Sequence, residues 1–251
     1  MTIDDDDDLR GLRRCGRVVA SARDAMIAAA QPGVSTGELD SIGRRILREH
    51  GARSAPRLAY RFPGTTCISV NDEAAHGVPS TTRILREGDV VNIDVSAELD
   101  GYWTDTGASV GVGAVAPIAE RLLRSTRLAQ QEAMDAARAG TRLSRLGRVV
   151  QRRARRDGFS VIETLCGHGV GRHIHEEPSV PSFEDRGDQT LLWDGLVIAI
   201  EPFLSTGATD VVEDADGWTL RTPDGTLAAQ FEHTVVVTTG DPIVLTASLT
   251  P

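Results

Sequence analysis

The sequence predicts two similar α/β halves fused head to tail. The first observation is a repeat, because the stretch from Gly33 to Gly51 matches the stretch from Gly140 to Gly158 at a constant offset of 107 positions. The second is that an alanine-rich helical segment precedes each copy and strand-like sequence follows it. Chance similarity of two amphipathic helices is the alternative. A repeated half favours a site where the two halves meet.

Length and composition indicate a globular chain. Its 251 residues can bury a substantial core, and 40% are hydrophobic while 25% are charged, which excludes a wholly disordered protein. Five of the charges that make up the net charge of −9 come from Asp4 to Asp8, which leaves −4 and no indication of DNA binding. We expect a disordered acidic tail over 1–8. The remainder is expected to be one domain over 9–251, with halves of approximately 9–116 and 117–251.

Cysteine usage and hydropathy bear on location. The three cysteines are odd in number and widely spaced, which argues for a reducing compartment and against a disulfide framework. No apolar run reaches the roughly 18 residues of a membrane span. The acidic N-terminus does not fit a signal peptide. We therefore expect a cytoplasmic protein that does not associate with membranes.

Two helices are predicted at the start of the first half. Apolar residues recur at helical spacing over 9–30, and a proline-glycine pair then ends this helix. Ser35 or Thr36 is expected to cap the second helix, because Glu38 completes a capping box. That helix is expected to stop at Gly51.

After a short strand over 66–70, the sequence predicts a β-hairpin. Residues 89–99 alternate between apolar and polar side chains, and Asp100-Gly101 is a strong signal for a tight turn. The returning strand carries Asp105, 11 positions after Asp94. Since the turn lies about midway, the two carboxylates are expected to lie near each other across the hairpin.

The strands of the second half also carry acidic residues. A strand over 161–166 leads into a histidine-rich stretch. A second strand, over 196–200, ends at Glu201. A third, over 228–237, contains Glu232 within an otherwise apolar run.

The histidine-rich stretch over 162–180, IETLCGHGVGRHIHEEPSV, favours metal or proton chemistry. It places three histidines and two glutamates within ten residues, between glycines and a proline. Histidine supplies a nitrogen ligand or a proton shuttle near neutral pH, and glycine lets the backbone approach a ligand closely. A polar surface loop is the alternative.

Four acidic residues share one unusual feature, which is that each lies within or at the end of a strongly apolar β segment. A buried, unpaired carboxylate is costly unless it is protonated, paired or bound to a metal, and the chain contains no lysine. Four converging carboxylates would neutralise two divalent cations, and an added imidazole suits Mn, Fe, Co or Zn. The expected metal ligands are Asp94, Asp105, His168, Glu201 and Glu232. Any one of the acids alone could be a solvent-facing residue at a strand end.

Six segments that together span most of the chain form recognisable motifs. They are PGVSTGEL (32–39), SVNDEAAHGVP (69–79), VVNIDVSAELDGYWTDT (90–106), GHGVGRHIHEEPSV (167–180), IAIEPF (198–203) and DGWTLRTPDGTLAAQFEHTVVV (216–237). They resemble the type I methionine aminopeptidases, whose pita-bread fold is shared with aminopeptidase P and creatinase. The resemblance implies an α+β fold with two pseudo-symmetric α/β halves around a curved, mostly antiparallel sheet. The ligand intervals of 11, 63, 33 and 31 residues fit the short type I form.

The resemblance also implies roles for the residues. Asp94 and Asp105 would hold one of two metal ions and bridge to the other, while the remaining three ligands complete the pair. Glu201 would handle the proton of the attacking water. His76 would contact the substrate near the scissile amide, and His175 would hydrogen-bond the scissile carbonyl oxygen. The alternative for each of these two histidines is a polar loop residue.

The implied substrate pocket departs from the family pattern. Phe62 stands where Tyr is common, Ala59 where a second aromatic residue often lies, and Ile174 where Phe is usual. Fewer aromatic walls mean fewer sulfur–aromatic contacts, at roughly 0.3–1.5 kcal/mol each, and a less certain fit to methionine. The expected substrate-binding residues are Phe62, Cys67, His76, Ile174, His175 and Trp218.

The implied function is hydrolysis of the N-terminal methionine from nascent proteins and peptides with a small second residue, by attack of a metal-activated water. One alternative is an Xaa-Pro aminopeptidase or dipeptidase, although those usually carry a further N-terminal domain. The other is a catalytically silent pita-bread module that binds peptides or ribosomes. Loss of metal ligands would indicate the silent module, and all five are present. We expect a monomer.

A basic stripe at helical spacing lies in the second half. It is consistent with contact to ribosomal RNA during cotranslational processing, but a solvated helix face is the favoured interpretation. The stripe comprises Arg145, Arg148, Arg152, Arg155 and Arg156.

Overall fold

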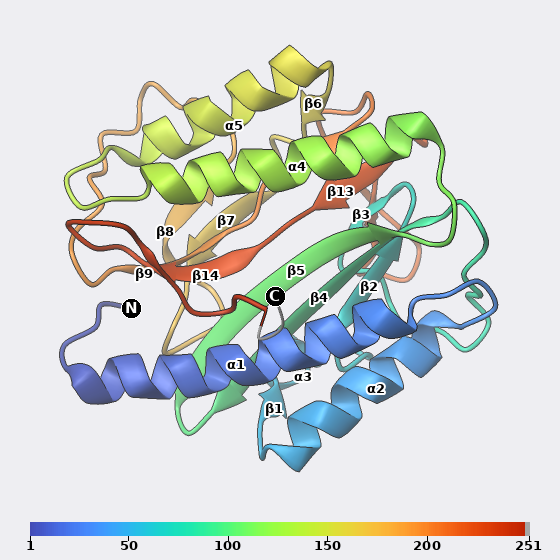
Figure 1. Cartoon of the computed structure of the whole chain (residues 1–251), viewed down its shortest axis with the longest axis horizontal. Coiled ribbons are helices and arrows are strands. Elements are labelled where there is room, and N and C mark those ends of the chain that lie inside the picture. The colour runs from blue at the N-terminus through green and yellow to red at the C-terminus, as the bar shows by residue number, and fades with distance from the viewer. Residues whose placement is uncertain (249–251) are drawn as a thin grey trace.

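The computed structural model describes residues 1–248, so the last three residues of the expected domain lie outside the described part (Figure 1). Helices and strands are both abundant, which confirms the expected α+β class. The helices are α1 (Asp6–Ala29), α2 (Thr36–Glu49), α3 (Ala55–Tyr60), α4 (Pro117–Ala136) and α5 (Leu143–Asp157). The strands are β1 (Arg53–Ser54), β2 (Cys67–Val70), β3 (Glu73–Ala75), β4 (Val90–Leu99), β5 (Tyr102–Gly111), β6 (Ser160–Val161), β7 (Cys166–Gly169), β8 (Glu176–Pro181), β9 (Val197–Ile200), β10 (Phe203–Ser205), β11 (Val212–Glu213), β12 (Leu220–Arg221), β13 (Ala228–Gln230), β14 (His233–Val236) and β15 (Ile243–Val244).

The first half places helices α1 and α2 against a small antiparallel sheet. In this sheet β4 lies between β1 and β2 and also pairs with β5. Ser35 is the cap of α2, and the capping box with Glu38 is present. Asp100 and Gly101 form the two-residue turn between β4 and β5 with φ of 53° and 85°, as a primed hairpin turn requires.

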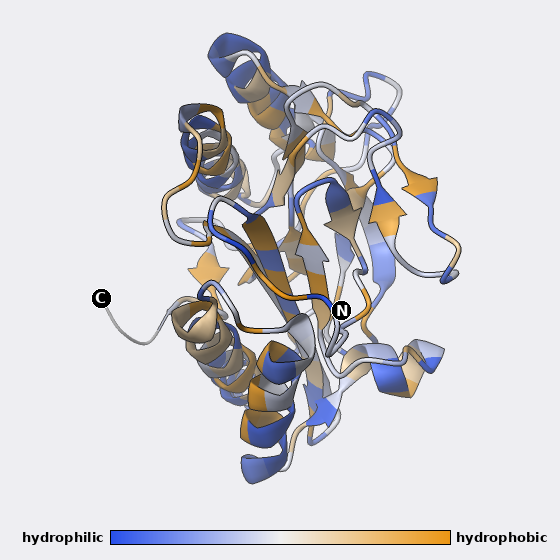
Figure 2. Ribbon diagram, turned by 90° about the vertical axis from the view of Figure 1, so that its right-hand side faces the viewer, coloured by the Kyte–Doolittle hydropathy of each residue, from blue (hydrophilic) through white to orange (hydrophobic). Residues whose placement is uncertain are grey.

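The second half repeats the helix pair with α4 and α5 and adds a sheet in the order β15-β14-β9-β7-β8. The helix α2 at 36–49 and the helix α5 at 143–157 agree with the sequence offset of 107. Each helix pair covers its own aliphatic core. Figures 1 and 2 together show the four long helices on one side of the strands.

Two segments of the second half differ from the sequence-based expectation. The strand expected over 228–237 is divided into β13 and β14, which pair with β10 and β9 respectively. Periodicity does not detect this division, because the residues at the break, 230–232, are buried like most of the two strands beside them. The histidine-rich stretch is a hairpin of β7 and β8, not a loop throughout.

Residues 1–8 are ordered, which corrects the expected disordered tail. The Asp5 carboxylate accepts a hydrogen bond from the backbone N–H of Asp8 at 2.9 Å and caps α1. Asp8 is buried and accepts hydrogen bonds from Arg172 at 2.5 Å and from the Tyr102 hydroxyl at 3.0 Å. Acidic residues are stabilised at a helix N-terminus by the helix dipole, so this acidic run begins a helix.

Candidate metal centre and its cavity

The β4–β5 hairpin brings the first two predicted ligands together. Asp94 pairs with Gly107, and Asp105 pairs with Ser96, so the two carboxylates are diagonal neighbours on one face. Asp105 is held in place by a hydrogen bond from the Thr106 backbone N–H to its Oδ1 at 2.9 Å. The expected proximity is confirmed.

Glu201 and Glu232 lie at matching breaks in two neighbouring strand pairs. Glu201 separates β9 from β10, and Glu232 separates β13 from β14. β9 pairs with β14, and β10 pairs with β13. The segments β9–β10 and β13–β14 therefore pass from one sheet into another at the same level. The backbone N–H of Glu232 also donates to Gly107 O at 2.8 Å, so this break lies against the first half of the molecule.

His168 of β7 completes the cluster from the side. Its Nδ1 lies 2.8 Å from Gly169 O, and a carbonyl oxygen can only accept, so Nδ1 carries the proton and Nε2 offers its lone pair. That Nε2 lies 3.3 Å from Glu201 Oε1 and 3.8 Å from Asp105 Oδ2. Ligand atoms of Asp105, His168 and Glu232 lie within 4.8 Å of one another.

The electrostatics of this cluster fit a cation. Burial and the neighbouring carboxylates raise the pKa values of Asp94, Glu201 and Glu232 well above their ordinary range. Burial raises the pKa of Asp105 to about 6 and lowers that of His168 to about 3. Within residues 1–248, no arginine pairs with these carboxylates, and Glu232 Oε1 is buried without a hydrogen-bond partner. Positive charge from bound metal would satisfy all of these groups.

Gln230, to which no role was assigned from the sequence, orients both glutamates. Its Nε2 donates to Glu201 Oε2 and to Glu232 Oε2, each at 3.2 Å, and its Oε1 accepts from Asn92 Nδ2 at 2.8 Å. Gly107 makes room for it, because a Cβ there would lie 2.2 Å from Gln230 Oε1. A polar residue two positions before Glu232 in an apolar strand was the available signal.

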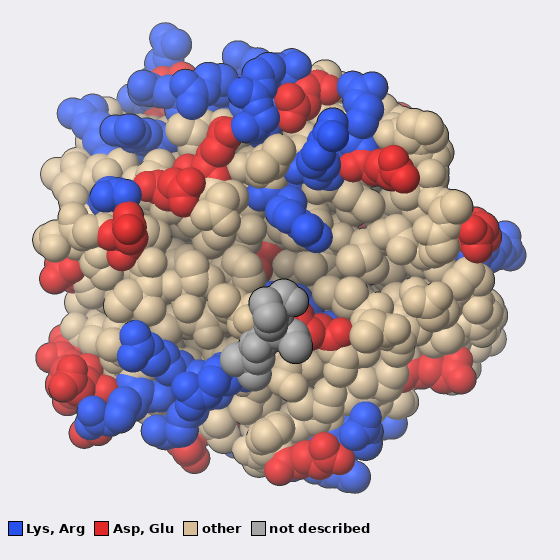
Figure 3. All heavy atoms as spheres, in the orientation of Figure 1, with Lys and Arg blue, Asp and Glu red and all other residues tan. Residues whose placement is uncertain are grey.

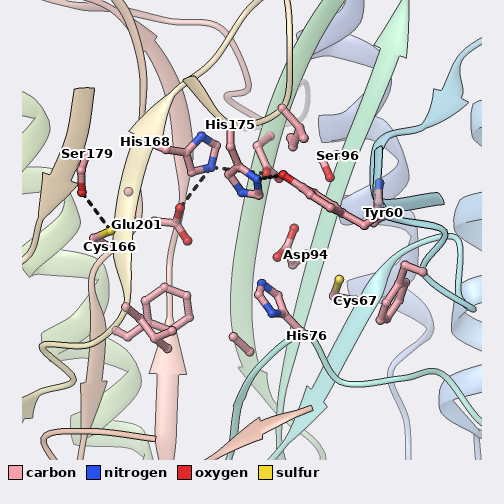
Figure 4. A pocket seen from close by; sticks show the side chains of 18 of the residues that line it. Tyr60, Cys67, His76, Asp94, Ser96, Cys166, His168, His175, Ser179 and Glu201 are labelled. Carbon is pink, nitrogen blue, oxygen red and sulfur yellow. Dashed lines mark hydrogen bonds and ion pairs between the residues drawn. The ribbon is translucent and has the colours of Figure 1, made fainter. Parts of the chain in front are cut away.

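The cluster opens into a cavity of about 510 Å³. His76 and His175 both line it, and their rings are accessible from it. Burial lowers the pKa of both imidazoles, and His76 lowers that of His175 further, so both are neutral near pH 7. Figure 4 shows them around the same space as Asp94.

The six expected substrate-binding residues all line this one cavity. Phe62 and Trp218 meet edge to face with ring centroids 5.2 Å apart. Tyr60, which was not among the expected residues, also lines the cavity, whereas the neighbouring Ala59 does not. Phe203 lines the cavity as well, so the pocket has two more aromatic residues than the sequence predicted.

Comparison with known proteins identifies the family to which the chain belongs. The model of metallopeptidase family M24 matches residues 10–239. The chain is 50% identical to methionine aminopeptidase 2 of Bacillus subtilis over 247 residues, covering 98% of this chain and 99% of that protein. It is 38% identical to the methionine aminopeptidase of Escherichia coli over 241 residues, covering 96% and 91% respectively.

Solved structures agree with the sequence comparison. The methionine aminopeptidase of Thermotoga maritima superposes with a TM-score of 0.95 at 32% identity, covering 98% of this chain and 99% of that one. The prolidase of Pyrococcus furiosus, at 23% identity and a TM-score of 0.77, shares the fold, and this chain covers 65% of it. These likenesses confirm the expected pita-bread fold. The chain therefore belongs to metallopeptidase family M24 and, within it, to the methionine aminopeptidases.

Proposed function

We propose that this protein is a metal-dependent aminopeptidase that removes the N-terminal methionine from peptides and nascent chains with a small second residue. The observation that carries this proposal is the cluster of four carboxylates and one imidazole, of which all but Glu232 line the cavity and all but Asp94 are buried. The extensive identity to methionine aminopeptidases supports it.

The cluster would hold two divalent ions, because four carboxylates carry enough negative charge for two. Such ions supply Lewis-acid polarisation of the scissile carbonyl and lower the pKa of water. Imidazole and carboxylate donors suit Mn, Fe, Co or Zn. The residues that would hold them are Asp94, Asp105, His168, Glu201 and Glu232.

Three side chains would carry out the proton and charge chemistry. Glu201 would take the proton of the attacking water and deliver it to the leaving nitrogen. His175 would donate a hydrogen bond to the scissile carbonyl oxygen as negative charge develops there. His76 would contact the scissile amide.

The remaining lining residues would select the first residue of the substrate. Phe62 and Trp218 form an aromatic corner, while Cys67 and Ile174 are buried beside the cavity. A thioether side chain is stabilised by contact with aromatic ring edges. This lining supports methionine as the first residue.

A test of the proposal starts from metal-stripped protein to which Mn, Fe or Co is added back. We expect metal-dependent release of methionine from Met-Ala-Ser, and no cleavage of Leu-Ala-Ser or of Xaa-Pro peptides. Asp105→Asn should abolish release, whereas Asp135→Asn, at an exposed position on α4, should not. Cleavage of a different first residue would retain the metal centre but refute the specificity. Absence of cleavage with metal bound would indicate a silent binding module.

Ribosomes and the cytoplasm are the proposed setting for this activity. The arginines of the stripe on α5 are exposed, and Figure 3 shows basic side chains gathered over α4 and α5. Arg148 pairs with Glu184 and Arg156 with Asp157. Cosedimentation with ribosomes at low salt that is lost when Arg145, Arg152 and Arg155 are replaced by Gln would support RNA contact; unchanged cosedimentation would exclude it.

All three cysteines are free, and no helix within residues 1–248 is long and apolar enough to cross a membrane.

A further inference from the structure

Tyr60 is positioned at the cavity by a short helix whose two ends are both fixed. At the N-terminal end of α3, the Ser54 hydroxyl donates to Thr65 O at 2.6 Å. At the C-terminal end, Arg61 adopts a left-handed conformation with φ of 61° and stops the helix directly after Tyr60. The ring of Tyr60 therefore lies at the wall of the cavity, although the residue is 46% exposed.

The phenol oxygen of Tyr60 contacts Nδ1 of His175 (Figure 4). The two ring centroids are 5.5 Å apart, with the ring planes inclined by 38°. On its other side, the imidazole of His175 packs edge to face on His168 at 4.3 Å between centroids. His175 is thus held between a metal-ligand candidate and the phenol, with one ring nitrogen already engaged.

A neutral imidazole carries one proton, on either Nδ1 or Nε2. If the phenol donates to Nδ1, the proton must reside on Nε2, which becomes the hydrogen-bond donor available to the substrate. Burial raises the pKa of Tyr60, so the phenol keeps its proton. A neutral imidazole offers one nitrogen as an acceptor, and the nitrogen that faces the phenol is Nδ1.

We propose that Tyr60 is a positioning residue that fixes His175 as the Nε2–H tautomer and orients that N–H toward the scissile carbonyl. This inference rests on the proposed function, because it assigns His175 the task of stabilising the carbonyl oxygen. It adds a residue of α3 to those that position the catalytic groups, and it gives the phenol of Tyr60 a chemical role besides apolar contact.

The first test replaces Tyr60 with Phe, which keeps the ring and removes the hydroxyl. We expect kcat for Met-Ala-Ser to fall about tenfold, the equivalent of one neutral hydrogen bond, with little change in KM or in bound metal. Leu58→Ala is the matched control, because Leu58 is an exposed residue of the same helix that does not line the cavity. An unchanged kcat in Tyr60→Phe, or an equal loss in the control, would overturn the proposal.

A double-mutant cycle tests whether Tyr60 acts through His175. In a His175→Ala background, Tyr60→Phe should have no further effect on kcat, because the group that it positions is gone. A full tenfold loss in that background would assign the hydroxyl an independent role and refute the proposal.

A spectroscopic measurement keeps this test independent of activity. Nitrogen-15 NMR of histidine-labelled, Zn²⁺-loaded protein distinguishes the two ring nitrogens, with His175→Ala providing the assignment. We expect a protonated Nε2 and an unprotonated Nδ1, and a shift toward a tautomer mixture in Tyr60→Phe. A protonated Nδ1 in the parent protein would refute the inference. If the parent protein released no methionine, the proposed function would fail, and the NMR result would still decide the tautomer.

Discussion

At the scale of single residues, the backbone alone directs His76 into the cavity. His76 has a left-handed φ of 56°, and the next residue is Gly77, where a Cβ would lie 2.2 Å from Ile68 O. The chain therefore passes close to β2 only because position 77 lacks a side chain. Because this turn depends on the backbone at positions 76 and 77, we expect that the imidazole of His76 can be removed without disturbing the metal ligands.

His76→Ala should consequently separate metal binding from turnover. We expect bound metal to be unchanged and kcat to fall roughly 100-fold, which is typical for loss of a group that acts on charge in the transition state. Metal content by elemental analysis and methionine release from Met-Ala-Ser measure the two effects. His50→Ala, at an exposed position, is the control and should retain activity. Full activity of His76→Ala would remove it from the mechanism.

Residues differ in how far the sequence reveals their role. Asp94 and Glu232 were predictable because a carboxylate buried in an apolar strand is costly unless a proton or a cation neutralises it. Gln230 and Tyr60 were not identified, since an amide or a phenol is common at a surface. Their roles depend on contacts with Glu201 and His175 that exist only once distant strands and α3 are folded together.

At the scale of elements, helix α5 is fitted closely against the segment that follows β8. A Cβ at Gly147 would lie 1.9 Å from Phe183 O and 2.5 Å from Phe183 C. Those atoms are backbone and cannot move aside as a flexible side chain can. Gly147 is therefore required by packing, even though glycine within a helix is less favourable than alanine by about 1 kcal/mol.

Gly147→Ala should destabilise the protein despite improving helix propensity. Overpacking against backbone costs roughly 1–3 kcal/mol, which should lower the urea midpoint of unfolding. The matched control is Gly43→Ala in α2, where the new Cβ would meet Met26 Sδ at 2.7 Å and Thr66 Cγ2 at 3.0 Å. The Met26 side chain is flexible, so a change below about 1 kcal/mol is expected there. A Gly147→Ala protein as stable as the parent would show that α5 is not packed in this way.

Elements with local signals were predicted best. The β4–β5 hairpin follows from alternation and an Asp-Gly turn, and α2 follows from its capping box. The helix α3 was missed because six residues with a proline show no periodicity. The division of β13 from β14 was missed because strand pairing across the sheets, not local pattern, determines it.

At the scale of the whole molecule, the ligands come from both repeated halves. Asp94 and Glu201 are separated by the same 107 positions as the two helix pairs, and β4 and β9 are the strands that carry or precede them. Glu232 hydrogen-bonds through its backbone to Gly107 of the opposite half. Metal bound by this set would therefore link the halves and contribute to the stability of the entire fold.

The pH dependence of stability without metal follows from the shifted groups. Raised carboxyl pKa values mean that the folded state binds more protons than the unfolded state, so stability falls as pH rises toward those raised values. His168 has the opposite sign, because its pKa is lowered from 6.5 to about 3 and its effect is confined to pH below 6.5. Above that pH the histidine is neutral in both states, and the carboxylates determine the slope.

Metal-stripped protein should therefore lose stability as pH rises above about 6.5, because protons leave the buried carboxyl groups whose pKa values are raised in the folded state. Protein with saturating Mn²⁺ should show little slope over that range, because the carboxylates are then ionised and compensated in the folded state. Thermal unfolding of both forms at several pH values measures this, and the gap in Tm between them should widen with rising pH. Glu232→Gln removes one of the four charges and should reduce the slope of the metal-free form. A gap that narrows with rising pH would contradict the assignment of these carboxylates to a shared cation site.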